Sequence, residues 1–567
     1  MANSKAGSKG GPDERSARQR KIDTPGEEKS TQPPNIEPHA DLLNRARQSG
    51  FEMAAIEPRG ERSHKPYLVL ILALFAVAAI AVVLTRSPWW DEGMLADPAH
   101  NLARSGVLGS TVASGKGHPF VRDFVGYERY TFWTVPLYLV VLAGWIKLFG
   151  FSIVTIRLLS LVLAQGLVVA SYVIVSRLTR SRLGGLTASL LVGTDYTVTL
   201  SAATARMDMM AAAFGFGALA VYLALRERNL NLAALAGGAL AAASCYTHPV
   251  GVLHSGGLLL MAFYLDGRRL RWRHFALAAV PYLVLTALWA VYIAQAPRIF
   301  LAQMEAHAGY RLGGFVSPVK AILGDLRYRY VWYFMPQKSG LAGRFKLVVL
   351  FGYLGGILAA VSFPRLRRAP GVKLLLLLSA LYYLELALLD GERVPHYMVH
   401  VITMWALLLG AIVGRAWSRE LVSRRALAGV LSAFIGFQIA GSAIKVRADS
   451  YRNDYLKMIG FVREHSTPDS LVMGPSEMQF GLGADRKLVD DARLGGLTGA
   501  SPDVIVLDPF HPGPQPFERR EPDMARHVSD VLSRFRLSAT YGAYKVYLPA
   551  GTGGPSTATR EDGSHLH

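Results

Sequence analysis

The apolar run from Tyr67 to Thr85 (YLVLILALFAVAAIAVVLT) is followed almost at once by Pro88-Trp89-Trp90-Asp91-Glu92-Gly93. The run is long enough to cross the hydrocarbon core of a bilayer as one helix. Two adjacent carboxylates therefore stand where this helix leaves the membrane, beside tryptophans, which prefer that depth. Charge near hydrocarbon is costly unless it has a task or a partner. The acidic pair is the first candidate for a functional site, although an aromatic belt followed by a solvated loop would give the same pattern.

The composition predicts a polytopic membrane protein. The chain has 567 residues, is 51% hydrophobic and has a mean hydropathy of +0.25, which is too apolar for a soluble protein of this size. Its formal net charge of +20 lies in short arginine-rich clusters between apolar runs, which is a topology signal and not a nucleic-acid-binding face. Cys245 is the single cysteine, so the chain has neither an intrachain disulfide nor a thiolate metal site.

Apolar runs after the first one predict about eleven full crossings in all. Loops between their inner ends are short and basic, which places those ends and the N-terminus in the cytoplasm. The predicted spans are 67–85, 153–176, 183–203, 209–225, 232–247, 249–265, 275–295, 345–363, 374–389, 396–414 and 426–444. We therefore expect an all-α bundle in a prokaryotic plasma membrane.

The short apolar segment 136–149 decides the topology. If it crossed the membrane, Arg177, Arg180, Arg182 and every later arginine cluster would lie outside. If it lies along the outer face or dips into it, all the clusters fall inside, as the positive-inside rule requires. We therefore predict an interfacial or re-entrant helix here.

The chain divides into four parts by composition. Residues 1–64 read as a disordered cytoplasmic tail, and 65–444 as the transmembrane domain. Residues 445–550 read as a small extracytoplasmic α/β domain, and 551–567 as a second disordered tail. In the α/β domain we expect helices at 454–465 and 521–536 and strands at 470–474, 503–508 and 544–548.

The predicted topology gathers a set of polar residues on the outer side. Each has a simpler interpretation: Arg206 and Asp208 can pair at a helix start, His248-Pro249 can be a turn, and Arg327 and Arg329 can reach headgroups. The set comprises Asp91, Glu92, Arg206, Asp208, His248, Tyr310, Arg311, Asp325, Arg327, Arg329, Tyr330, Arg393, His396 and Tyr397.

Carboxylates and arginines at a membrane face suggest one chemistry in particular. A carboxylate can act as general base on an acceptor hydroxyl or amine, and arginines can bind a phosphate leaving group bidentately. Both functions are needed to transfer a sugar from a polyprenyl-phosphate donor, whose headgroup lies at the bilayer surface.

Several short motifs resemble the GT-C glycosyltransferases, specifically the group of protein O-mannosyltransferases and lipid A aminoarabinose transferases. Their order and spacing relative to the spans carry the resemblance, which is best over 85–265. The motifs are Trp90-Asp91-Glu92-Gly93 with Ala99, Leu102 and Gly106, then Pro136-Leu137-Tyr138, Trp145, Leu148-Phe149-Gly150 and Arg157-Leu158, and finally Ala205-Arg206-Met207-Asp208-Met209.

The resemblance implies a GT-C bundle with outer-face juxtamembrane helices in the first loop. It implies an inverting transfer from a polyprenyl- or dolichyl-phosphate monosaccharide. Asp91 is then the catalytic base, with Glu92 beside it, and Asp208 is the second acidic residue of the site. The acceptor would be a lipid, a glycan or a protein of the cell envelope.

The chain departs from this family at the donor phosphate. Aminoarabinose-type members often have Lys-Pro-Pro-Leu where this chain has Thr134-Val135-Pro136-Leu137, and His248 replaces a lysine near the third outer turn. Arg129, or Arg122 with His118, is a candidate substitute. No spacing of acidic residues and histidines fixes a metal, so metal dependence stays open. The residues expected to contact the donor phosphate are Arg122, Arg129, Arg206, His248 and His396.

Two other function classes remain. A transporter or flippase of a lipid-linked or charged solute should have polar residues at mid-membrane, and Asp195 is such a residue. A structural assembly protein would use the 445–550 domain to bind a partner. Most ionisable residues cluster at one face instead, which favours the glycosyltransferase.

Overall fold

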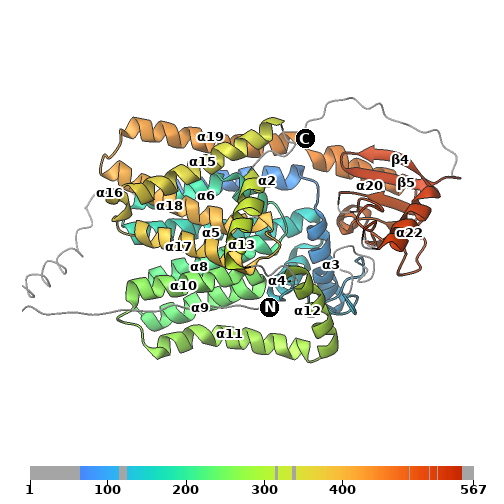
Figure 1. The fold of residues 1–567 in the computed structure, drawn as a ribbon, viewed down its shortest axis with the longest axis horizontal. Coiled ribbons are helices and arrows are strands. Elements are labelled where there is room, and N and C mark those ends of the chain that lie inside the picture. Colours follow the sequence, from blue (N-terminus) through green and yellow to red (C-terminus); the bar gives the residue numbers. More distant parts are fainter. Residues whose placement is uncertain are drawn as a thin grey trace, which may run out of the picture. The chain divides into compact units, whose positions relative to one another are not determined.

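The computed structural model describes residues 64–113, 124–312, 317–334, 340–483, 486–509, 511–519 and 521–551 (Figure 1). They belong to one compact unit that begins at His64. The two tails predicted to be disordered lie outside these residues, apart from their innermost ends, and so does Arg122. The side chains of Tyr310 and Arg311 are not described either.

Among the described residues, nine helical segments are long and apolar enough to cross a membrane. They confirm the prediction of a polytopic helical membrane protein. Their helices are α2 (Lys65–Thr85), α5 (Ile153–Thr179), α8 (Met207–Leu225), α9 (Leu230–Thr247), α10 (Val252–Asp266), α11 (Trp272–Ile293), α17 (Val372–Leu389), α18 (Met398–Ser418) and α19 (Arg424–Ala448). The predicted span at 345–363 corresponds to α15 (Gly340–Ser362).

The predicted span at 183–203 is not one continuous helix. It consists of α6 (Arg182–Thr194) and α7 (Tyr196–Ala202), which meet at Asp195. The Asp195 carboxylate accepts the backbone N–H groups of Thr197 at 2.8 Å and Val198 at 3.1 Å, and so caps α7. Its other oxygen accepts Tyr353 Oη–H at 2.9 Å and Gln438 Nε2–H at 2.7 Å. Asp195, whose place in the middle of a predicted span favoured a transporter, therefore caps α7, and both of its carboxylate oxygens accept hydrogen bonds.

Two short helices follow α2. Helix α3 (Trp90–Ser105) carries the acidic pair, and α4 (Leu137–Phe149) packs on it through a shared apolar cluster that includes Leu95, Leu139 and Leu142. The 13 residues of α4 span about 20 Å, which is less than the ~30 Å of a hydrocarbon core. This length agrees with the predicted helix that does not cross the membrane, and its position along the outer face stays a prediction.

The segment 296–343, which lies between two predicted spans, is largely helical where it is described. It forms α12 (Pro297–Leu312), α13 (Pro318–Asp325), the π-helical turn η3 (Leu326–Val331) and α14 (Trp332–Phe334). Arg329 is buried in this segment and pairs with Asp325 and Asp390, each at 2.7 Å. The interpretation of Arg329 as a headgroup contact is therefore wrong.

The C-terminal part contains a five-stranded sheet in the order β2-β1-β3-β5-β4. β1 is parallel to β2 and β3, whereas β5 is antiparallel to β3 and β4. Helices α20 (Leu456–Glu464) and α22 (Pro522–Ser533) pack on opposite faces, because alternate strand residues such as Val472 and Met473 join different apolar clusters. The strands are β1 (Leu471–Met473), β2 (Lys487–Val489), β3 (Val504–Leu507), β4 (Phe535–Tyr541) and β5 (Tyr544–Pro549).

The α/β character of this part agrees with the prediction, but two strands were not predicted. β2 has only three residues, and β4 begins at Phe535, inside the range expected for the helix 521–536. That helix ends at Ser533 instead. Two short helices after β1, η6 (Ser476–Met478) and α21 (Gln479–Leu482), place the polar end of β1 against α3.

Candidate active site

The two adjacent carboxylates begin α3, in its first turn, where negative charge is favourable. Trp89 precedes the helix in an extended conformation, and its backbone N–H donates to Glu92 Oε2 at 2.9 Å. The Glu92 side chain therefore folds back over the helix start. Asp91, one residue earlier on the turn, points in another direction and pairs with Arg206.

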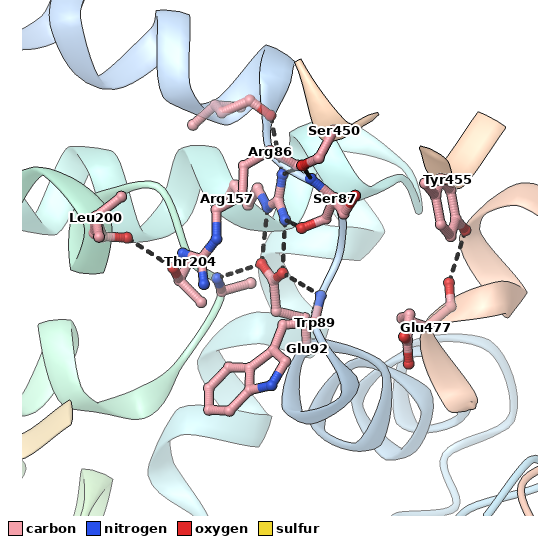
Figure 2. A network of polar contacts seen from close by, with 12 residues as sticks. Arg86, Ser87, Trp89, Glu92, Arg157, Leu200, Thr204, Ser450, Tyr455 and Glu477 are labelled. Carbon is pink, nitrogen blue, oxygen red and sulfur yellow. Dashed lines mark hydrogen bonds and ion pairs between the residues drawn. The ribbon is translucent and has the colours of Figure 1, made fainter. Parts of the chain in front are cut away.

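Glu92 is fully buried in a network that joins several elements (Figure 2). Its two oxygens accept Arg157 Nε–H at 2.8 Å and Nη2–H at 2.6 Å, and Oε1 also accepts the Ala205 backbone N–H at 2.8 Å. Burial alone would raise the pKa of Glu92, but the Arg157 guanidinium outweighs it and holds that pKa below its ordinary value. The carboxylate is thus a fixed, ionised anchor.

Arg157 completes the same network from α5. Its remaining N–H groups donate to the backbone carbonyls of Val83 at 3.0 Å, Arg86 at 2.9 Å and Ser87 at 3.0 Å, where α2 ends (Figure 2). The Val83 carbonyl lies in the last turn of α2, and those of Arg86 and Ser87 follow the helix, so the guanidinium caps the end of α2 as well. One buried ion pair therefore fixes the end of α2, the start of α3 and the turn before α8.

Asp91 lies on the opposite side of the helix start and is less enclosed, with its side chain 23% exposed. Arg206 Nη1 forms an ion pair with Asp91 Oδ2, while Arg206 Nε donates to Asp208 Oδ2 at 2.6 Å. The Arg206 guanidinium lies 4.8 Å from the centre of the Trp89 ring, which in turn packs against His396 at 4.5 Å. The structure thus brings together Asp91, Arg206, Asp208 and His396 from three distant parts of the chain.

The predicted pairing of Arg206 with Asp208 at a helix start is present, and it extends to Asp91. Arg206 is extended and stands immediately before α8, so that Asp208 lies in the first turn of that helix. Asp208 Oδ1 is buried and has no hydrogen-bond partner among the described residues. A buried carboxylate oxygen of this kind has capacity for one more donor.

A cavity of about 110 Å³ opens beside this cluster. Three of its lining residues carry positive charge: Arg86, Arg206 and Lys346. Arg86 Nη1 donates to Thr204 Oγ1, and Lys346 Nζ lies 4.7 Å from the centre of the Tyr333 ring. Such a lining suits an anionic group. The lining residues are Arg86, Tyr196, Thr197, Leu200, Ser201, Thr204, Arg206, Asp208, Met209, Tyr333, Lys346, Pro395 and His396.

Two residues predicted at the donor phosphate do not line this cavity. Arg129 is exposed and stacks over Tyr130 at 5.6 Å. His248 is buried, accepts the Val250 backbone N–H at 3.0 Å through Nδ1, and lies 3.3 Å from Tyr397 Oη through Nε2. Arg206 and His396 line the cavity, and Arg122 and His118 lie outside the described residues.

Three basic residues of the site were not predicted from the sequence. Arg86 is a positive charge at the end of α2 that is predicted to face outward, against the trend of the positive-inside rule, and this exception was a usable signal. Arg157 is a lone charge at the start of an apolar run, which marks a residue with a buried partner. Lys346 carries no comparable signal, because it lies at the edge of a predicted span.

Within the described ranges, no three His, Cys, Asp or Glu side chains are grouped in a way that could hold a metal ion.

Comparison with known proteins gives similarity in structure only. No family model matches the chain, and no curated protein matches it. ArnT from Cupriavidus metallidurans bound to undecaprenyl phosphate matches with a TM-score of 0.52 at 16% identity, over 87% of this chain and 100% of that one. The apo form of the same protein matches with a TM-score of 0.53 at 15% identity, over 86% and 98%. The resemblance seen in the sequence is therefore confirmed for the fold: the chain shares the polytopic helical fold of this ArnT.

Proposed function

We propose that this protein is a membrane glycosyltransferase that moves a monosaccharide from a polyprenyl-phosphate donor to a lipid, glycan or protein acceptor. The observation that carries the proposal is the ion pair of Asp91 with Arg206, because Arg206 lines the cation-lined cavity on its other side. Arg206 therefore contacts the proposed base, Asp91, and also lines the cavity proposed to bind the donor phosphate. The ArnT structure that shares this fold was solved with undecaprenyl phosphate bound.

Asp91 is the general base in this proposal. It is the more exposed of the two carboxylates, so an acceptor can approach it. Its carboxylate takes the acceptor proton as the acceptor oxygen or nitrogen bonds to the anomeric carbon, and the bond from that carbon to the phosphate oxygen breaks. Glu92 serves as the anchor for Asp91, because its oxygens already accept four hydrogen bonds.

The phosphate leaving group is stabilised by the cationic side of the cavity. Arg86 and Lys346 are the residues we add to the predicted set, alongside Arg206 and His396. Positive charge in a partly enclosed hollow stabilises the negative charge that builds up on the leaving phosphate more than it would in water. Arg129 and His248 do not line the cavity and are not assigned this role. Asp208 holds Arg206 in place through its 2.6 Å bond.

The experiment measures transfer of radiolabelled sugar from polyprenyl-phosphate monosaccharides in membranes containing wild type, Asp91→Asn or Glu128→Gln. Glu128 is an exposed carboxylate of the same loop and serves as the matched control. Label should enter one of the extractable lipid, glycan or protein fractions with wild type and Glu128→Gln but not with Asp91→Asn. Equal transfer by all three would exclude Asp91 as the base, and no transfer from any donor would count against the enzyme itself.

We also propose that the site and the C-terminal sheet face the outside of the cell, with the N-terminus in the cytoplasm. The support is the arginine-rich turns at the opposite ends of the helices. In a Cys245→Ala background, a membrane-impermeant maleimide should label Asp469→Cys in intact cells and should leave Glu227→Cys unlabelled. Both positions are exposed, so accessibility within the protein is matched. The reverse labelling pattern would invert the topology.

A further inference from the structure

The carboxyl ends of the three parallel strands gather a buried polar cluster. Asp490 directly follows β2, Glu477 follows β1 after a short turn, and Asp508 directly follows β3, with His511 shortly after it. Parallel strands end at the same edge of a sheet, which is where such folds commonly place functional groups. The cluster is buried, with Asp490 at 0% and His511 at 3% exposure.

His511 is held between two of these carboxylates. Its Nε2 lies 2.8 Å from Asp490 Oδ1, and its Nδ1 lies 2.6 Å from Asp508 Oδ1. The backbone N–H of His511 also donates to Asp508 Oδ1 at 2.7 Å. Both ring nitrogens therefore face acceptors, an arrangement that suits the doubly protonated imidazolium.

The cluster reaches the start of α3 through Asp490. Asp490 Oδ2 accepts the Trp90 indole N–H at 3.2 Å and the Ser476 backbone N–H at 2.9 Å. Ser476 Oγ–H donates to the Trp90 carbonyl at 3.2 Å, and Gln479 Nε2–H donates to the Gly93 carbonyl at 3.0 Å. The sheet domain therefore contacts the chain immediately before and shortly after Asp91.

The fit at this contact is close. A Cβ atom at Gly93 would overlap the backbone nitrogen of Glu477 and the carbonyl carbon of Ser476. Glycine at this position lets two backbones approach within contact distance. A close, hydrogen-bonded contact of this kind can fix the orientation of a helix start, whereas a loosely attached domain cannot.

We propose that Asp490 and His511 are positioning residues for the transfer reaction: by holding Trp90, they fix the start of α3 so that Asp91 is oriented toward Arg206. The inference rests on the proposed function, since it assigns a supporting pair to the proposed base. It also gives the C-terminal domain a role within the catalytic unit. Catalytic groups usually need such support, because small displacements of a base cost large factors in rate.

The charge of His511 makes the contact sensitive to pH. Burial alone would lower the pKa of His511, but the Asp490 and Asp508 carboxylates outweigh it and raise that pKa well above its ordinary value. Glu477, from the turn after β1, is the other described acidic group that faces it. Burial raises the pKa of Glu477 well above its ordinary value. Loss of the His511 proton would leave the buried Asp490 and Asp508 carboxylates without their cation, so the hold on Trp90 weakens on the alkaline side.

The test compares full-length Trp90→Phe, His511→Gln and, as control, His527→Gln. Trp90→Phe removes the indole N–H and keeps an aromatic ring, so it isolates one hydrogen bond. His527 is a partly buried histidine of the same domain whose Nε2 lies 3.2 Å from the Leu494 carbonyl oxygen. Hydrogen exchange of the backbone amides at the start of α3 is followed by mass spectrometry, together with kcat and KM for transfer over pH.

In Trp90→Phe and His511→Gln we expect exchange at the start of α3 to accelerate about tenfold or more and kcat to fall roughly 10- to 100-fold, with KM nearly unchanged. We expect kcat of wild type to decline on the alkaline side, kcat of His511→Gln to lack this decline, and His527→Gln to match wild type. If hydrogen exchange at the start of α3 is unchanged in Trp90→Phe, the proposed coupling between the C-terminal domain and α3 is overturned. This result does not depend on knowing the sugar donor. Faster exchange with unchanged kcat would overturn the positioning role.

Discussion

Glu92 and Asp91 are chain neighbours with the same charge, yet they lie in opposite environments. Glu92 is fully buried and accepts four hydrogen bonds, two of them from Arg157. Asp91 is 23% exposed and pairs with Arg206, which lines the cavity. The difference shows how one helix start can combine a rigid support and a reactive group: the enclosed carboxylate fixes the backbone, and the adjacent one remains accessible for chemistry.

The largest expected effect comes from removing the support. Arg157→Ala leaves the Glu92 carboxylate buried without its cation, and breaking a buried pair in this way costs about 3–5 kcal/mol. We expect the free energy of unfolding to fall by that amount, seen as a lower Tm and lower yield of detergent-purified protein. The exposed Arg129→Ala serves as control and should change Tm little. If both variants unfold at the wild-type temperature, the network does not anchor the three elements.

Asp91→Asn should show the opposite behaviour, losing activity while keeping stability. General base catalysis contributes typically about 10²- to 10⁴-fold, so we expect kcat to fall within that range. The pair with Arg206 is partly exposed, so its loss should change Tm only slightly. Steady-state transfer kinetics and a thermal melt on the same preparation separate the two effects. A clearly lower Tm for Asp91→Asn would mean that Asp91, like Glu92, supports the fold.

Lys346→Met tests the cavity on the far side of Arg206. The substitution keeps much of the side-chain volume but removes one positive charge from the lining. We expect the KM for the polyprenyl-phosphate donor to rise by about tenfold, the scale of one charge-assisted contact of about 1.5 kcal/mol, with a smaller change in kcat. Titration of donor in detergent micelles measures it. An unchanged KM would place the donor phosphate elsewhere, and the same assay with Arg129→Met would then examine the predicted alternative.

The smallest effect is a pH dependence of stability to which the buried Glu92 carboxylate should contribute. The pKa of Glu92 is lowered in the folded state, so its ionised form stabilises the fold above the ordinary glutamate pKa. That contribution declines as pH falls below this ordinary value and is lost once pH passes the lowered folded-state pKa. Tm measured across the acidic range should therefore fall less steeply for Glu92→Gln than for wild type. Parallel curves would mean that other carboxylates account for the acid response.

The arrangement of spans was predictable because crossings are governed by length and hydropathy, which are local properties. The break at Asp195 was not, since an aspartate within an apolar run gives no sign that it will cap a helix. β2 and β4 were not predicted for a related reason: both strands are stabilised by pairing with neighbouring strands of the sheet. Pairing across the sheet is a tertiary property that local sequence does not contain.

The candidate site was predictable in its acidic residues and less so in its cations. Asp91 and Asp208 came from motif resemblance, and the structure brings both to Arg206. Glu92 was expected to share the chemistry, but its partner Arg157 lies 65 residues further along the chain, and only the fold reveals that contact. Arg86 and Lys346 reach one cavity from two separate helices, so no local pattern joins them.

The contact between Trp90 and Asp490 joins residues 400 positions apart. A ribosome adds about 5–20 residues per second, so Asp490 is made on the order of 20–80 s after Trp90. During that interval α3 exists without the domain that holds its start. The proposed base therefore acquires its final orientation only after Asp490 and the strands around it have been made, and a chain truncated before them that has inserted all its spans would still lack a finished site.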